Sequence, residues 1–291
     1  MSWLLLILSI SLAVFKSSLY NAYAKKEQPG IGSTFRFNAA AYGMAAVIAL
    51  VAVLFADKSL SRPTIFCALG YAVIVFLLQT VSVTAMRVGT MALTSVCVMY
   101  GMIIPSLAGP LFWHEKLGAL QIIGILMMLA SLWLLRGKPE KNSGTITKKW
   151  ILLAAAAFVL SGMAGVMEKI HQSTPGRSEK AGFVLTACLF MLGFSVVSIL
   201  IVRKTGRDGR FNCNIAVFGA VSGAVIGIYS IVNLSLAGLL DSMIYYPVAN
   251  GGAMLLTVLV SFAAFKEPLD KYKIAGTVLG LCGIAALSIP V

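Results

Sequence analysis

Charged residues are scarce in this sequence. Asp, Glu, Lys and Arg together make up 11% of the 291 residues, whereas a soluble domain carries roughly 25%. This shortage excludes an ordinary soluble globular protein. Disorder is excluded too, because a disordered chain combines high charge with low hydrophobicity, and here 59% of the residues are hydrophobic.

Residues that hold metals, disulfides or nucleotides are also few. The five cysteines are scattered without a CxxC pair, so we expect small apolar packing residues rather than a disulfide or a metal site. The two histidines have no ligand-type spacing. The sequence contains no GxxxxGK[ST] phosphate loop. We therefore expect no ATP hydrolysis, no cofactor, no metal and no catalytic residue.

Long uncharged runs, by contrast, are abundant. A helix needs ~20 apolar residues to cross the ~30 Å hydrocarbon core of a bilayer. Ten segments have about this length and use up nearly all of the chain: 3–23 (interrupted only by Lys16), 37–56, 63–86, 88–113, 117–135, 150–167, 181–202, 211–240, 242–265 and 274–291. We predict an all-α membrane protein with about ten transmembrane helices, a multi-pass protein of the cell membrane (plasma or inner).

The net charge of +13 is explained by orientation in the membrane. Sixteen of the 23 Lys and Arg residues lie in loops after odd-numbered spans, and six lie in loops after even-numbered spans. Cytoplasmic loops are enriched in Lys and Arg, which predicts that both termini face outward. Nucleic acid is not an expected partner, because no basic helix or aromatic-and-basic stripe is present.

The chain contains an internal repeat at an offset of 152 residues. Segment 88–135 aligns with 240–287 without gaps and shares ten identical positions, among them Glu115/Glu267 and Gly124/Gly276. The repeat unit holds five spans, and because five is odd the second copy enters the membrane from the opposite side. Such inverted repeats place a binding site near the midplane between the halves and allow alternating access.

These features resemble the drug/metabolite transporter superfamily, in its ten-helix form with two EamA-type domains. The resemblance covers almost the whole chain and is carried by the following residues: Lys16, Arg36, the turn Glu115-Lys116-Leu117 followed by Gly124, Lys169, and the turn Glu267-Pro268-Leu269 followed by Gly276. It implies export of small solutes such as metabolites, amino acids or drugs. It also implies cytoplasmic termini, contrary to the charge count.

On this resemblance the chain divides into a first five-helix repeat at 1–137, a basic linker at 138–149 and a second repeat at 150–291. The expected partners are a small-molecule solute and the lipid bilayer. A homodimer is compatible with such a bundle.

Charges within the spans are candidate functional residues, since burying a charge in the bilayer is costly. Lys16 and Lys169 occupy nearly the same place in the two repeats. They either reach the interface with their long stems or flank the midplane as a trap for an anionic solute. Glu168 either sits at the interface or carries a proton, because a carboxylate withdrawn from water titrates nearer neutral pH.

Uncharged polar residues within the spans are the other candidates. Gln79 and Asn233 lie at nearly equivalent repeat positions and either bind solute or join helices. The stretch from Tyr245 through Tyr246 and Asn250 to Gly252 includes Pro247, so we expect an interrupted ninth span beside a solute pathway. The alternative is an aromatic belt at the interface. Gly219, Gly223 and Gly227 form a GxxxGxxxG face that predicts close helix packing.

A secondary transporter of a small organic solute is the function that these patterns favour. One alternative is a non-transporting scaffold or subunit, which predicts no polar helix interior. The other is a lipid-modifying membrane enzyme, for which His114-Glu115 is the candidate acid and base. Because the repeat conserves only the glutamate of this pair, we expect Glu115 to have a structural role, such as capping the helix that follows it.

Overall fold

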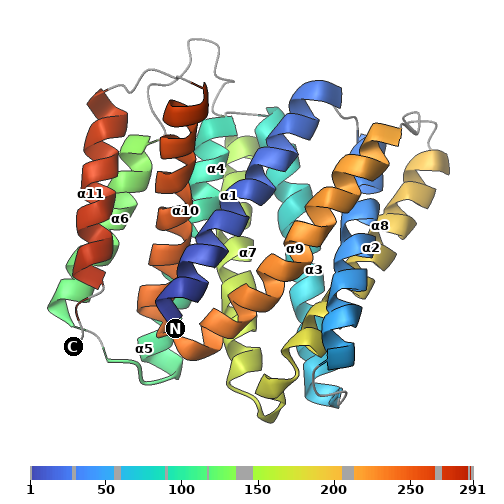
Figure 1. Ribbon diagram of the computed structural model, residues 1–291. Coiled ribbons are helices and arrows are strands. Elements are labelled where there is room, and N and C mark those ends of the chain that lie inside the picture. Colours follow the sequence, from blue (N-terminus) through green and yellow to red (C-terminus); the bar gives the residue numbers. More distant parts are fainter. Residues whose placement is uncertain are drawn as a thin grey trace. The chain divides into compact units, whose positions relative to one another are not determined.

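The computed structural model describes residues 2–27, 31–55, 60–88, 91–116, 118–135, 147–204, 213–265, 271–287 and 289. In these ranges the protein is all-helical (Figure 1). The helices are α1 (Ser2–Glu27), α2 (Ile31–Phe55), α3 (Arg62–Val88), α4 (Met91–Tyr100), α5 (Ile103–Phe112), α6 (Ala119–Leu135), α7 (Lys148–Gln172), the 3₁₀ helix η1 (Pro175–Ser178), α8 (Lys180–Lys204), α9 (Cys213–Leu239), α10 (Ser242–Phe265) and α11 (Lys271–Leu287).

Among the residues that the structure describes, six helical stretches are long and apolar enough to cross a membrane: Gly32–Phe55, Arg62–Met86, Thr94–Phe112, Lys148–Gln172, Lys180–Lys204 and Asn214–Leu239. Large apolar side chains on several of these helices face outward. Phe55 is 88% exposed and Leu152 is 73% exposed. A water-soluble surface rarely presents contiguous apolar area of this kind. The predicted class, a helical multi-pass membrane protein, is confirmed, while the count of ten crossings stays a prediction.

The helices form two compact units. Unit 1 consists of Met1–Ile10, Leu77–Lys169 and Leu239–Val291, and unit 2 consists of Ser11–Phe76 and Ile170–Gly238. Each unit contains chain from both predicted repeats.

An antiparallel pair of helices, α6 and α11, stands out in unit 1 (Figure 1). The Ser131 hydroxyl donates to the Gly276 carbonyl at 2.7 Å. Seven residues earlier on α6, a β-carbon placed on Gly124 would lie only 3.0 Å from the Gly283 carbonyl oxygen. Small residues therefore let the two backbones approach closely, as is typical of helices packed in a membrane.

The glycine face predicted for the eighth span lies in unit 2, on α9, and packs on α2. A β-carbon on Gly219 would meet Ala40, one on Gly223 would meet the Ala41 carbonyl, and one on Gly227 would meet Ile48. The predicted role in close helix packing is confirmed. α2 also packs along α8, where alanines of both helices lie in one buried cluster with Tyr42, Phe183 and Met191.

Candidate functional site

The fourth predicted span is a broken helix. Gly101 and Met102 form a turn between α4 and α5. Pro105 has no amide hydrogen to give to the Gly101 carbonyl, which instead accepts from the Ile104 amide at 3.0 Å. The turn packs tightly on α7, since a β-carbon on Gly101 would lie 2.6 Å from that of Ser161. The interrupted backbone is thus covered by protein, as a break within a membrane requires.

The ninth predicted span is continuous, so the predicted interruption at Pro247 was wrong. Pro247 is the sixth residue of α10, and its missing amide affects only the carbonyl of Met243 in the first turn. The glycines that follow serve packing. Gly251 lies against the Met128 side chain of α6, and a β-carbon on Gly252 would lie 2.7 Å from Ile10 Cδ1 of α1.

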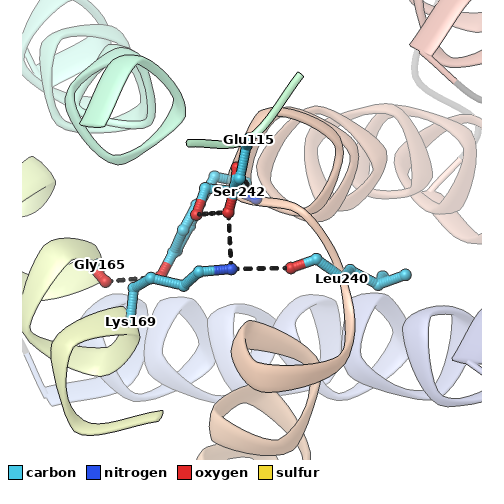
Figure 2. Close-up of polar contacts among 6 residues, drawn as sticks. Glu115, Gly165, Lys169, Leu240 and Ser242 are labelled. Carbon is cyan, nitrogen blue, oxygen red and sulfur yellow. Dashed lines mark hydrogen bonds and ion pairs between the residues drawn. The ribbon is translucent and has the colours of Figure 1, made fainter. Parts of the chain in front are cut away.

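A buried ion pair joins three segments of unit 1 (Figure 2). Lys169, near the end of α7, places its Nζ 2.8 Å from Glu115 Oε1, which lies in the turn between α5 and α6. The side chains are 12% and 6% exposed, respectively. Glu115 also accepts the Ser242 amide hydrogen at 2.8 Å and the Ser242 hydroxyl at 3.1 Å. Lys169 Nζ donates to the Leu240 carbonyl at 3.2 Å.

The charges of this pair match the helix ends that they touch. Leu240 follows the last residue of α9, where carbonyl groups are left without helical partners. Ser242 begins α10, where amide groups are left free. The cation therefore lies at the negative end of one helix dipole and the anion at the positive end of the next. These contacts offset part of the desolvation cost of burying both charges.

Local backbone geometry brings Glu115 to this position. His114 adopts a left-handed conformation with φ of 53°, and the Glu115 amide donates back to the Gly109 carbonyl at 3.4 Å. The predicted capping role of Glu115 is found, but the helix it caps is α10 and not the next helix, α6. The sequence offered only one hint of this, the recurrence of the glutamate in both repeats.

Several predicted site residues surround the ion pair. The Tyr246 hydroxyl donates to the Gly165 carbonyl at 2.5 Å, one turn before Lys169 on α7. The Tyr245 ring is buried, with its centroid 4.7 Å from that of Tyr246, and Asn250 donates to the Tyr246 carbonyl at 2.9 Å. Both tyrosines are at most 5% exposed, so they form no interface belt within unit 1.

The other predicted residues are distributed over both units. Gln79 is half-buried on α3 and Glu168 is buried on α7, both in unit 1. Lys16 and Asn233 belong to unit 2. Lys16 Nζ lies 4.3 Å from the centroid of the Tyr229 ring, a cation–π contact. Asn233 is buried one turn beyond Tyr229 on α9. Tyr229 was not predicted, although its spacing of four residues from Asn233 places both on one helix face.

Neither a protein-family model nor a curated protein matches the sequence. Among solved structures, 29 chains match. One, described only as "Crystal structure of protein", has a TM-score of 0.77 and 16% sequence identity over 99% of this chain and 96% of that chain. At this identity the likeness shows the fold alone.

Proposed function

We propose that the protein is a secondary transporter that moves a small organic solute across the cell membrane by alternating access, with export as the expected direction. The observation that carries the proposal is the reciprocal packing of helices that are equivalent in the predicted repeat.

Shifting the bounds of α6 by the repeat offset gives the bounds of α11, from residue 271 to residue 287. Under this offset Gly124 is equivalent to Gly276, and Ser131 is equivalent to Gly283. Gly124 approaches Gly283, and Ser131 bonds to Gly276. The offset therefore maps the Gly124–Gly283 contact onto the Gly276–Ser131 contact, and this reciprocity supports a two-fold relation between the repeats. Because the helices are antiparallel, we propose an axis that runs across them and lies in the membrane plane.

A second pair of contacts in unit 1 supports the same relation. Gly252 of α10 packs on Ile10 of α1, and Gly101 packs on Gly162 of α7. Under the offset Ile10 is equivalent to Gly162, and Gly252 is equivalent to Tyr100, the neighbour of Gly101. Inverted repeats with a broken helix are typical of secondary transporters, which bind solute near the midplane.

We propose that the solute contacts the polar residues of the spans. In unit 1 these are Gln79, Lys169, Tyr245, Tyr246 and Asn250, and in unit 2 they are Lys16 and Asn233. Glu168 is a proposed proton carrier. The resemblance to the EamA-type family of drug/metabolite transporters agrees with this assignment. The broken α4–α5 segment and the buried Glu115–Lys169 pair give unit 1 the polar interior that a simple scaffold does not need.

The test begins with a thermal-shift screen of the purified protein against amino acids, nucleosides, sugars and cationic drugs, because a ligand stabilises the state that binds it. Compounds that raise the melting temperature are then followed as labelled solutes in counterflow into proteoliposomes. We expect flux in the wild type and reduced flux in variants of Lys16, Tyr246 or Asn250 that still fold. Absence of counterflow for every stabilising compound would overturn the proposal.

A further inference from the structure

A second carboxylate network lies in unit 2, away from the ion pair. Glu179, just before α8, is 7% exposed. Its Oε2 accepts the Ser61 amide hydrogen at 2.9 Å and the Ser61 hydroxyl at 2.8 Å, and the Thr64 hydroxyl also bonds to the carboxylate. Because Ser61 directly precedes α3, the carboxylate of Glu179 caps that helix from 118 residues away.

The surrounding side chains orient the donors toward Glu179. The Gln172 amide nitrogen lies 3.0 Å from His171 Nδ1 and 3.5 Å from the Arg177 carbonyl, so its two hydrogens serve these two acceptors. His171 therefore accepts at Nδ1 and carries its hydrogen on Nε2, which lies 3.3 Å from the Thr64 hydroxyl. Thr64 can accept this hydrogen and give its own to the carboxylate or to the Ser61 hydroxyl 3.1 Å away, which itself donates to Glu179.

The acid strength of Glu179 depends on this cap. Burial raises the pKa of Glu179, and the hydrogen bonds from Thr64 and Ser61 outweigh burial, so the pKa lies below its ordinary value. In a conformation without the cap these donors would be lost. Any burial of the carboxyl group that remained there would raise the pKa of Glu179. The capped conformation thus favours the carboxylate and the uncapped one favours the neutral acid, so that proton binding and opening are linked.

We propose that Glu179 is a proton-binding site that couples this transporter to a proton gradient, separate from the proton carrier proposed at Glu168, with Thr64 and His171 as positioning residues. One proton binds to the carboxylate, whose charge goes from −1 to zero, and the N-terminus of α3 is released. This inference rests on the proposed function. The charged residues next to these groups along the chain are Arg62 at the start of α3, Arg177 on η1 and Lys180 at the start of α8. Glu168 and Lys169 precede His171 on α7, and Arg203 and Lys204 lie at the far end of α8.

The test uses the proton itself as the probe. Infrared difference spectra of wild-type protein in proteoliposomes, titrated from neutral to acid pH, report protonation of buried carboxyl groups. We expect the carboxyl signal of Glu179 to be missing in Glu179→Gln. The same signal should persist in Glu168→Gln, which removes the other proposed proton carrier. Thr64→Val removes one donor and should raise the midpoint of that signal by roughly one to two pH units. Ser178→Ala, an exposed change in the same turn, is the control and should leave the midpoint unchanged.

A second readout follows the helix that the cap holds. Glu179→Gln mimics the neutral acid, so amides in the first turn of α3 should exchange hydrogen faster than in the wild type at the same neutral pH. His171→Gln should move the titration midpoint in the same direction as Thr64→Val. A wild-type titration in Glu179→Gln, or an unmoved midpoint in Thr64→Val, would overturn the site.

The two proposals fail separately. If no solute gives counterflow, the transport proposal fails, whatever the carboxyl titration shows. If solute counterflow persists and proton-driven uptake is also unchanged in Glu179→Gln, the coupling site alone is wrong. We expect Glu179→Gln to keep counterflow and to lose acceleration by a pH gradient.

Discussion

The carboxylate of Glu115 lies against the α-carbon of Gly109, in the space that a β-carbon would fill. A β-carbon there would also lie 3.1 Å from that of Ser242. Gly109 therefore leaves free the space in which the Glu115 carboxylate contacts Ser242 and Lys169. The absence of a side chain at this position is what allows the turn after α5 to reach the start of α10.

Replacing Gly109 by alanine should displace Glu115 and destabilise the protein by about 1–3 kcal/mol, the usual cost of overpacking. The matched control is Gly193→Ala on α8, where a β-carbon meets nothing within 4 Å. There the better helix propensity of alanine should be neutral or stabilising by up to about 1 kcal/mol. The two variants are compared by their melting temperatures in one detergent. Equal melting temperatures would contradict the proposal that Glu115 needs the space beside Gly109.

The Glu115–Lys169 pair should show strong coupling in a double-mutant cycle. Each single alanine variant leaves one buried charge unpaired, which costs about 3–5 kcal/mol. The double variant leaves neither charge, so it should cost about 1–3 kcal/mol less than the sum of the singles. Unfolding in mixed micelles with increasing SDS measures all four free energies. Simple additivity would mean that the pair contributes no mutual stabilisation.

Gly223 should be the most sensitive glycine of the α9 face. Its β-carbon would collide with the Ala41 carbonyl, which belongs to rigid backbone of α2. We expect Gly223→Ala to lower stability by about 1–3 kcal/mol. Gly43→Ala, on α2 itself with nothing within 4 Å of the added atom, should not lower it. Thermal unfolding monitored by circular dichroism makes the comparison, and a stable Gly223→Ala would argue against direct backbone contact.

The cap made by Glu179 predicts a stability that depends on pH. Because the pKa of Glu179 is lowered in the folded protein, its contribution is complete above the ordinary value of 4.5 and is lost as the pH falls below it. The wild type should therefore have a higher melting temperature than Glu179→Gln at pH 6, and the difference between the two melting temperatures should decrease toward pH 3. A difference in melting temperature that stays constant from pH 6 to pH 3 would show that ionised Glu179 adds nothing to stability.

Many local features were predictable from the sequence because their causes are local. Each uncharged run overlaps a helix or, at 88–113, a pair of helices, since hydropathy and length act within a single segment. The glycine spacing of residues 219, 223 and 227 likewise predicted a packing face. The break in the fourth span was not predicted: Pro105 and Pro247 carry the same chemistry, but only the segment before Pro105 is interrupted. In an otherwise apolar segment, composition alone does not tell which proline interrupts the helix.

The sequence by itself determined the helical class, the segments apolar enough to enter a membrane and the short list of polar residues inside them. Only the tertiary structure decided which groups meet. It joins Glu115 to Ser242 across 127 residues and Glu179 to Ser61 across 118. It also seats Lys169 on Glu115 and Lys16 on Tyr229, although the two lysines look alike in the repeat. The physical reason is that burial demands a partner for every charge and amide, and which partner lies within reach is set by the packing of distant helices.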